Sequence, residues 1–377
     1  MDFLKPGRCI SVTGGLASEV SFQVTLSPMR RATKRRVRLF LKVLLIGTLI
    51  GIAYAGLIGF IFREPPFLRS LMGAIDGAAI TAPIALTEIF LLRTGWGRPW
   101  RQAPFLVTFG VKWLVYAMII TTVIAIEPGA RILGLLPSPG PLHSSLGRLA
   151  LVFSVVATFA VLFVLELYRI VGPRNLRNIV FGRYHRPRVE ERFFLFVDIA
   201  GSTSLAERLE PSAFHRFLAS VFHLASEPIE EFGGEIYQYV GDEMVVTWTV
   251  AEAQGDARPI ACFFAILAAL KEAAWELERD FGVAPGMRAA LHAGMVVCGE
   301  IGEIKRDIVF HGDVMNTAAR LEEATRDFDR RFLASVDALN RLRATERYAF
   351  DPLGPQTLRG RAAPVEVYAV SAAHGRT

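Results

Sequence analysis

Cysteine is scarce in this 377-residue sequence, where Cys9, Cys262 and Cys298 lie far apart. Three cysteines at these spacings exclude a disulfide framework and a zinc-binding motif, and they suit a reducing compartment. Acidic residues are scarce only in the first half: residues 1–180 contain 7 Asp and Glu against 20 Lys and Arg, whereas residues 181–377 contain 29 against 22. A basic, apolar half followed by a mildly acidic half is typical of a membrane module joined to a soluble module, and it argues against a nucleic-acid-binding protein.

Apolar residues make up 52% of the chain and concentrate in four long runs. Each run reaches the roughly 20 residues that a helix needs to cross the hydrocarbon core of a bilayer. The second run is the weaker one because it contains Asp76, Pro83 and Glu88. We therefore predict a basic segment, residues 1–38, that is not a cleavable signal peptide, followed by a transmembrane domain of four helices over residues 39–171. The runs cover about residues 39–62, 68–92, 105–126 and 149–171.

The distribution of Lys and Arg predicts the orientation of these helices. Basic residues precede the first run, lie between the second and third runs, and follow the fourth run from Arg169 to Arg188. Because basic loops stay on the cytoplasmic side, we expect a multi-pass protein of the cell inner membrane with both termini in the cytoplasm. On this topology Glu88 and Lys112 lie near the cytoplasmic side, where we expect them to pair. A sensing role for these residues or for Asp76 is the alternative.

Residues 172–190 connect the last run to the soluble half. The apolar residues of this linker recur at helical spacing, which favours a helix that transmits a signal and pairs with a copy of itself. A basic segment held by anionic lipid is the other interpretation, and the two are compatible.

Residues 191–377 alternate between strand-like and helix-like segments, which indicates an α+β sheet with helices on one face. We expect a single long helix over 256–281, and two strands, 287–293 and 296–301, that turn at Gly294. The other predicted strands are 192–198, 235–240, 244–248, 307–310, 356–358 and 365–370, and the other predicted helices are 211–232 and 313–324.

Two carboxylates stand out in this half. Asp198 ends the apolar strand Arg192–Val197, and Asp242 lies in the turn of the hairpin that follows. If the two strands are neighbours, about 4.8 Å apart, both carboxylates face one point and can share hard cations such as Mg²⁺. A helix N-cap is the commoner role of an aspartate at a strand end, so either residue alone is a weak signal.

The segment Phe196-Val197-Asp198-Ile199-Ala200-Gly201-Ser202-Thr203, together with Gly241-Asp242, resembles the two metal motifs of the class III nucleotide cyclases. The segment from Gly312 to Arg320 resembles the Gly-Asp-x-x-Asn-x-x-x-Arg segment of the same family, and Met287 to Gly294 resembles the strand before it. The motifs follow the family order over about residues 190–370. The resemblance implies a catalytic domain with a ferredoxin-like βαββαβ core over residues 191–377.

The resemblance also implies roles for individual residues. Asp198 and Asp242, with the carbonyl of Ile199, would hold two Mg²⁺ or Mn²⁺ ions per active site. Asn316 and Arg320 would act as catalytic residues on the ribose and the α-phosphate of the substrate. In this family the metal carboxylates and the Asn/Arg pair come from different protomers, so a homodimer is implied.

The substrate-binding positions depart from the family pattern. Gln238 stands where adenylate-selective members carry Lys, and Val309 stands where they carry Asp or Thr. Asp307 is a candidate substitute, and two further positions that fit a phosphate-binding turn are Arg359 and Arg361. We expect ATP as substrate, since the guanine-type pair is absent too. Guanylate cyclase activity and a catalytically inactive nucleotide-binding receptor are the alternatives, and a diguanylate cyclase is disfavoured because Val240 replaces the first Gly of its Gly-Gly-Asp-Glu motif.

Overall fold

The computed structural model describes residues 17–62, 66–91, 103–132, positions scattered between 152 and 167, and residues 170–304, 306–359 and 363–373. The chain divides into two compact units, Met1–Val171 and Gly172–Thr377. Each unit is described by itself.

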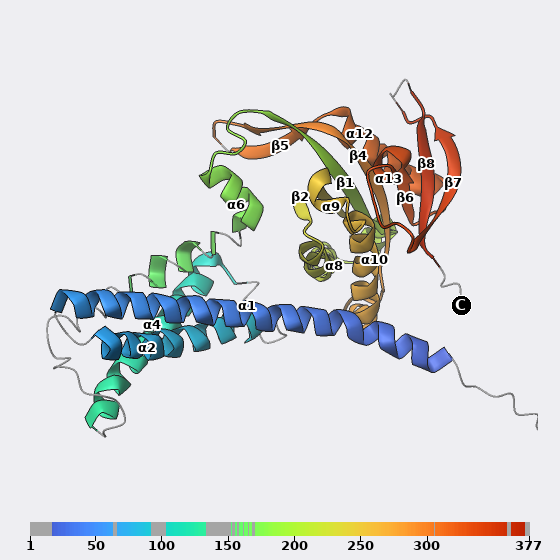
Figure 1. Cartoon of the computed structure of the whole chain (residues 1–377). Helices are drawn as coiled ribbons and strands as arrows, with labels where there is room; N and C mark the ends of the chain where they lie inside the picture. Colours follow the sequence, from blue (N-terminus) through green and yellow to red (C-terminus); the bar gives the residue numbers. More distant parts are fainter. Residues whose placement is uncertain are drawn as a thin grey trace, which may run out of the picture. The chain divides into compact units, whose positions relative to one another are not determined.

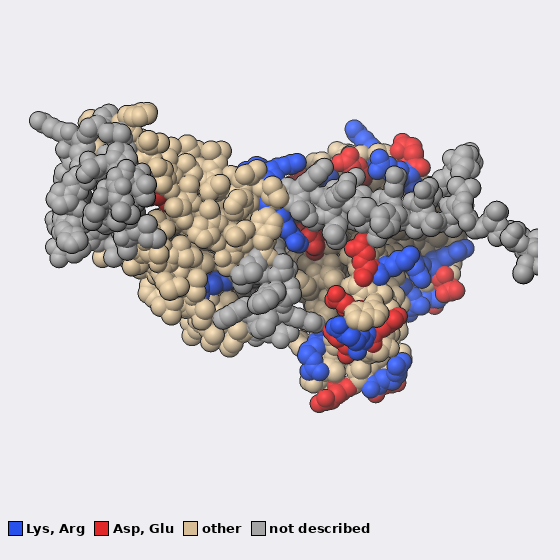
Figure 2. Space-filling model, turned by 90° about the horizontal axis from the view of Figure 1, so that it is seen from below, with Lys and Arg blue, Asp and Glu red and all other residues tan. Residues whose placement is uncertain are grey.

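The first unit is helical (Figure 1). Three of its helices contain stretches that are long and apolar enough to cross a membrane: Arg36–Ile61, Ser70–Phe90 and Phe105–Val123. The predicted fourth run, 149–171, lies partly outside the described residues, so four spanning helices are not confirmed. Figure 2 shows that the described surface of these helices is mostly free of Lys, Arg, Asp and Glu on the face in view. The elements are α1 (Ala17–Phe62), α2 (Pro66–Leu86), the π-helical turn η1 (Thr87–Leu91) and α4 (Phe105–Ile132).

Helices α1 and α2 approach each other through glycines. A Cβ atom on Gly51 would overlap the carbonyl oxygen of Gly73, and one on Gly77 would lie 2.5 Å from the carbonyl oxygen of Gly47. Gly47 and Gly51 are four residues apart on α1, as are Gly73 and Gly77 on α2. Small residues at this spacing let two helix backbones pack closely, which is how helices associate in a bilayer.

A buried ionic cluster joins α4 to its neighbours. The Lys112 ammonium lies 2.9 Å from Glu88 Oε1 and 2.6 Å from Glu166 Oε1, and the Tyr116 hydroxyl donates to Glu88 Oε1 at 2.9 Å. The predicted pair of Glu88 and Lys112 is therefore confirmed, whereas Glu166 had no predicted part in it. Glu88 lies in η1, five residues after Pro83, whose ring removes one helical N–H donor.

The second unit is a mixed α+β domain built on one sheet with the strand order β2-β3-β1-β4-β6-β8-β7, and β5 pairs with the far end of β4 (Figure 1). The expected βαββαβ core is present as β1-α8-β2-β3-α10-β4, in which β1 pairs antiparallel with β3 and β4. The strands are β1 (Arg188–Ala200), β2 (Glu235–Val240), β3 (Glu243–Thr249), β4 (Gly286–Ile301), β5 (Asp307–His311), β6 (Phe332–Ser335), β7 (Tyr348–Gln356) and β8 (Val365–Ala372).

Helices cover both faces of this sheet, so the prediction of helices on one face is wrong. Phe193, Leu195 and Val197 of β1 are buried with residues of α8 and α10. Phe194 and Phe196, which point the other way, are buried with residues of α12. An α+β sheet must cover any apolar face, and β1 is apolar on both. The helices are α6 (Pro173–Val180), α7 (Ser202–Arg208), α8 (Pro211–Glu231), α9 (Val250–Ala253), α10 (Arg258–Glu272), α11 (Ala274–Phe281), α12 (Asp313–Asp327) and α13 (Val336–Leu339).

Three further predictions about elements are wrong. The strand predicted over 356–358 is absent, because β7 ends at Gln356. The chain does not turn at Gly294, because β4 runs unbroken past it and Gly294 pairs with Arg192 of β1. A Cβ atom at this position would lie 3.4 Å from Val314, so the glycine lets α12 approach the sheet. The long helix over 256–281 is divided at Ala273 into α10 and α11, and Leu277 of α11 is buried in the core that α10 also covers.

Candidate active site

Two acidic side chains meet where β1 ends beside the β2–β3 hairpin. Asp198, only 4% exposed, pairs across the sheet with Glu243 of β3 on one side and Arg288 of β4 on the other. Asp242 lies in the hairpin turn, where Gly241 takes a left-handed conformation (φ 62°). A hydrogen bond with Asp242 raises the pKa of Asp198, which requires the two side chains to be in contact. The two residues predicted to bind metal therefore lie together.

Helix α12 brings two more charged residues to this point. Arg326, whose side chain is 58% exposed, donates from Nη2 to Asp198 Oδ2 at 3.1 Å. Glu322, one turn earlier, is 4% exposed, and its buried Oε1 atom has no hydrogen-bond partner in the described part of the chain. Neither residue was predicted as part of the site, and neither was Glu243. The available signals were the position of Glu243 directly after Asp242 and the four-residue spacing of Glu322 and Arg326.

The acidic side chains raise one another's pKa values. Burial, then the hydrogen bond and charge of Asp242, raise the pKa of Asp198 to about 6, although Arg326 opposes the rise. Burial and the charge of Glu322 raise the pKa of Glu243 to about 8, and burial and the charge of Asp198 raise that of Glu322 to about 7. Burial is the largest cause of each rise and the neighbouring carboxyl groups add to it, so the protonated forms of these three side chains are favoured relative to free side chains.

This donor set fits a hard divalent cation. Carboxylate oxygens are the ligands that Mg²⁺ and Mn²⁺ favour, and Glu322 Oε1 is buried with no hydrogen-bond donor among the described residues. Among the described residues, no group of three or more His, Cys, Asp or Glu side chains is arranged to hold a metal. Asp198 and Asp242 would therefore supply a partial ligand set, which suits Mg²⁺ because it usually keeps water and substrate phosphate oxygens as ligands. The side chain of Ile199 is buried in the core, so only its carbonyl could take part.

The predicted catalytic pair lies elsewhere on α12. Asn316 is exposed and Arg320 is half-buried. At a rise of 1.5 Å per residue, Arg320 lies about 9 Å and Asn316 about 15 Å along the helix axis from Arg326, the residue that contacts Asp198. The chain thus presents the carboxylates and the Asn/Arg pair at separate places on its surface.

The predicted substrate-binding positions lie around a contact between β2 and β5. The rings of Tyr237 and Phe310 pack with their centroids 4.8 Å apart, and Gln238 and Val309 are the adjacent residues. Gln238 is exposed at a register shift in β2, and Val309 is half-buried. Asp307 is exposed at the start of β5. Its exposure gives no support to the prediction that it takes the role of the polar residue missing at Val309.

The predicted phosphate-binding turn is described only in part. Arg359 is exposed and follows Leu358, which is buried against the sheet together with Leu321 of α12. Arg361 lies outside the described residues.

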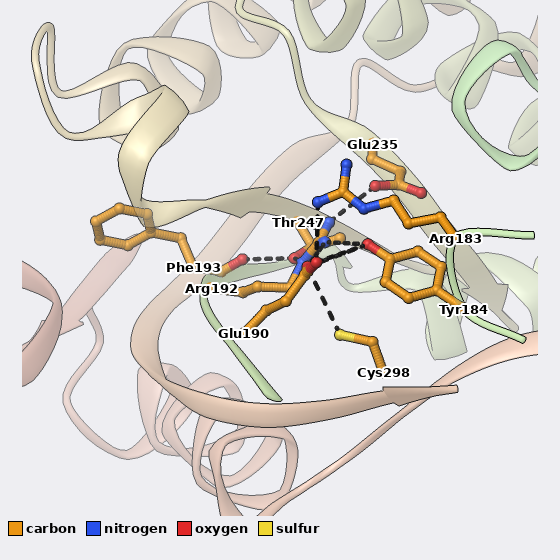
Figure 3. Close-up of polar contacts among 8 residues, drawn as sticks. All are labelled: Arg183, Tyr184, Glu190, Arg192, Phe193, Glu235, Thr247 and Cys298. Atoms are coloured by element: carbon orange, nitrogen blue, oxygen red, sulfur yellow. Dashed lines mark hydrogen bonds and ion pairs between the residues drawn. The ribbon is translucent and has the colours of Figure 1, made fainter. Parts of the chain in front are cut away.

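A buried network that sequence reasoning missed supports β1 (Figure 3). Arg192, 1% exposed, donates to Glu190 at 2.9 Å, to Glu235 at 2.8 Å and to Thr247 at 3.1 Å. Its guanidinium also lies 4.7 Å from the centroid of the Phe310 ring. The Tyr184 hydroxyl lies 3.1 Å from Glu190 Oε2, so the segment after α6 is tied to strands β1, β2 and β3. A charged residue inside an apolar strand was the available signal.

Comparison with known proteins agrees with this architecture. Residues 185–372 match the family profile described as the adenylate and guanylate cyclase catalytic domain. Adenylate cyclase 2 of Rhizobium meliloti (strain 1021) is 39% identical over 222 residues, which cover 59% of this chain and 61% of that protein. An adenylate cyclase of Anabaena cylindrica is 25% identical over 213 residues, which cover 54% of this chain and 40% of that protein.

Solved structures share this fold. The structure of a bacterial light-regulated adenylyl cyclase superposes with a TM-score of 0.50 at 22% identity, covering 61% of this chain and 67% of that chain. The family profile and the fold of the second unit are those of a class III nucleotide cyclase catalytic domain. The chain belongs to this family, and the resemblance noted in its motifs is confirmed. It spans less than two thirds of the length of the two curated relatives named above.

Proposed function

We propose that the protein is a membrane-bound adenylate cyclase that converts ATP to 3′,5′-cyclic AMP and pyrophosphate. The observation that carries this proposal is the meeting of Asp198 and Asp242 beside β1, within a domain of the cyclase family. Both relatives described above are named adenylate cyclases, which favours ATP over GTP.

The reaction needs positioning and charge stabilisation more than covalent chemistry by the protein. The ribose 3′-hydroxyl loses its proton to solvent, its oxygen bonds to the α-phosphorus, the bond from that phosphorus to the bridging oxygen breaks, and pyrophosphate leaves with the electron pair. Two Mg²⁺ or Mn²⁺ ions, when bound, would neutralise phosphate charge and favour the 3′-alkoxide. Asp198 and Asp242, together with the Ile199 carbonyl, would hold these ions.

The Asn316 and Arg320 side chains complete the site from a second copy of the chain. Arg320 carries a fixed positive charge for the α-phosphate as it becomes pentacovalent, and Asn316 orients the ribose by hydrogen bonds. Their offset of about 9 and 15 Å along α12 from the Asp198 contact supports a site shared between protomers. Exposed apolar side chains on the second unit supply surface for a homodimer, among them Tyr239, Val240, Met295, Val297 and Ile301.

Substrate selection rests on the residues around the Tyr237–Phe310 contact. The Gln238 side chain is exposed and can both donate to and accept from a purine edge, whereas Val309 offers only apolar contact. Arg359 and Arg361 are placed by their motif to meet the terminal phosphates. The three apolar helices support a location in the lipid bilayer of the cell inner membrane, and the distribution of Lys and Arg favours both termini and the catalytic unit in the cytoplasm.

The test is a nucleotide assay on the purified chain with Mg²⁺ or Mn²⁺. We expect cyclic AMP from ATP, and we expect Asp242→Asn to lower the rate by at least about 100-fold, since removal of a key electrostatic group costs that much. Thermal unfolding in EDTA is the folding control. Asp242→Asn should unfold no earlier than the wild type, because it removes one of several repelling carboxylates. Cyclic GMP as the sole product would show that the substrate is GTP and not ATP. No cyclic product with either nucleotide would favour a catalytically inactive nucleotide-binding receptor.

A further inference from the structure

Arg326 and Glu322 are arranged unusually at the C-terminal end of α12. They are four residues apart with the acid first, which is the favoured order for an ion pair along a helix. Arg326 nevertheless donates across to Asp198 on β1 at 3.1 Å. Glu322 Oε1 stays buried without a hydrogen-bond partner.

This arrangement is energetically unfavourable for Glu322, and it leaves the Arg326 side chain free to rotate. A buried carboxylate oxygen without a partner is unfavourable, because it has lost water and gained no donor. The Arg326 side chain is 58% exposed, so solvent rather than packing surrounds most of it and its rotation is little restricted. Residues four apart on a helix have Cβ atoms about 5–6 Å apart, so a guanidinium on Arg326 can reach Glu322.

The position of Arg326 also coincides with the position proposed for metal binding. Its guanidinium supplies positive charge to Asp198, which is the carboxylate assigned to the divalent cations. A cation that binds Asp198 competes with Arg326 for the same oxygen, since two positive groups beside one carboxylate oxygen repel each other.

We propose that Arg326 is a displaceable counter-ion that holds Asp198 when no metal is bound and transfers to Glu322 when a divalent cation takes its place. The inference rests on the proposed function. Arg326 and Glu322 are then positioning residues, because neither touches the substrate. Glu322 accepts the Arg326 guanidinium when it leaves Asp198. The accepting atom is Oε1, which has no hydrogen-bond partner among the described residues.

The exchange is tested by measuring Mn²⁺ binding to the purified full chain through the electron paramagnetic resonance signal of free Mn²⁺. Arg326→Gln removes the competitor, so the dissociation constant for Mn²⁺ should fall about two- to tenfold. Glu322→Gln removes the acceptor, so the constant should rise by a similar factor in the wild-type background. In the Arg326→Gln background Glu322→Gln should have a clearly smaller effect, because no arginine remains to be accommodated.

Two neighbouring residues of α12 and its exit provide matched controls. Glu323→Gln removes one exposed negative charge beside Glu322, and its effect should be the same in both backgrounds. Arg330→Gln removes one exposed positive charge four residues after Arg326 and should change the constant less than Arg326→Gln does.

The outcomes separate the inference from the proposed function. If Arg326→Gln leaves Mn²⁺ binding unchanged or weaker, or if Glu322→Gln acts equally in both backgrounds, the exchange is overturned while the metal site stands. If Asp242→Asn leaves Mn²⁺ binding unchanged, or if the wild-type chain binds no Mn²⁺, the metal site itself is overturned and the exchange with it.

Discussion

Glu190 illustrates how single charged residues are held in the catalytic unit. Burial acts to raise its pKa, but hydrogen bonds from Arg183 and Arg192 outweigh burial, so the pKa of Glu190 is lowered. Arg192 is itself buried and also paired with Glu235. Breaking one member of such a network leaves charge buried without compensation, which costs more than the intact network contributes.

Glu190→Gln should therefore destabilise the catalytic unit in a pH-dependent way. A carboxylate with a lowered folded pKa contributes stability that is fully present above its ordinary pKa of 4.5 and is lost as the pH falls through the folded value. The variant should unfold at a lower temperature than the wild type at pH 7, by the equivalent of about 1–3 kcal/mol. The difference should shrink as the pH is lowered below 4.5.

The next residue along the strand offers the control. Glu191 pairs with Arg341 at 2.7 Å, but both side chains are partly exposed. Glu191→Gln should cost about 0–1 kcal/mol, because exposed ion pairs contribute little. Thermal unfolding of the purified variants across pH measures both. Equal losses for the two variants, or a Glu190→Gln loss that does not depend on pH, would count against the buried network.

At this scale the sequence was informative where a residue's role follows from its local position. Asp198 at a strand end and Asp242 in a hairpin turn were found because the chain around each predicts its place. Glu322 and Arg326 were missed because their role depends on where the end of α12 meets β1, which is 128 residues away from Arg326 in sequence. No local pattern contains that contact.

At the scale of elements, a glycine can mark either a turn or a close contact between two backbones. Gly294 suggests a turn in sequence, yet it lies within β4 where α12 approaches the sheet. Gly51 and Gly73 lie within helices for the same reason, since each is in contact with the other's backbone. Sequence periodicity predicted most strands and the long helices, but it missed β6 and nearly all of β7, and it cannot tell which glycines face another backbone.

We therefore expect Gly51→Ala to weaken the packing of α1 against α2. The added methyl group would overlap the Gly73 carbonyl oxygen, which is backbone and cannot rotate away, so α1 and α2 must separate. Gly110→Ala in α4 is the matched control, because a Cβ atom there meets nothing within 4 Å. The control should be neutral or stabilising by about 0.5–1 kcal/mol, since alanine favours helix over glycine.

The measurement is thermal unfolding in detergent, combined with disulfide cross-linking of cysteines placed on α1 and α2. Gly51→Ala should lower the unfolding temperature and the cross-linking yield, whereas Gly110→Ala should lower neither. Similar behaviour of the two variants would show that the close approach of α1 and α2 does not contribute to stability.

At the scale of the whole molecule, charge divides the chain between its two units. The 7 acidic residues of the first 180 leave that half strongly basic, whereas the second half is acidic overall. Phosphate recognition in the proposed enzyme therefore depends on bound cations and on placed side chains such as Arg320, because the net charge of the catalytic half would repel a nucleotide.

The shared site is tested by mixing inactive chains. Asp198→Ala removes a metal ligand but keeps Arg320, and Arg320→Ala does the reverse, so each homodimer should be inactive. Random pairing of equal amounts should restore about a quarter of wild-type activity, because half of the dimers are mixed and each mixed dimer has one intact site of two. Mixing Asp198→Ala with Asp242→Ala is the control and should restore none, since both changes fall in the same half of the site. Cyclic AMP production, with pull-down of differently tagged chains to show mixed dimers, decides the matter: mixed dimers without recovered activity would mean that each chain builds its site alone.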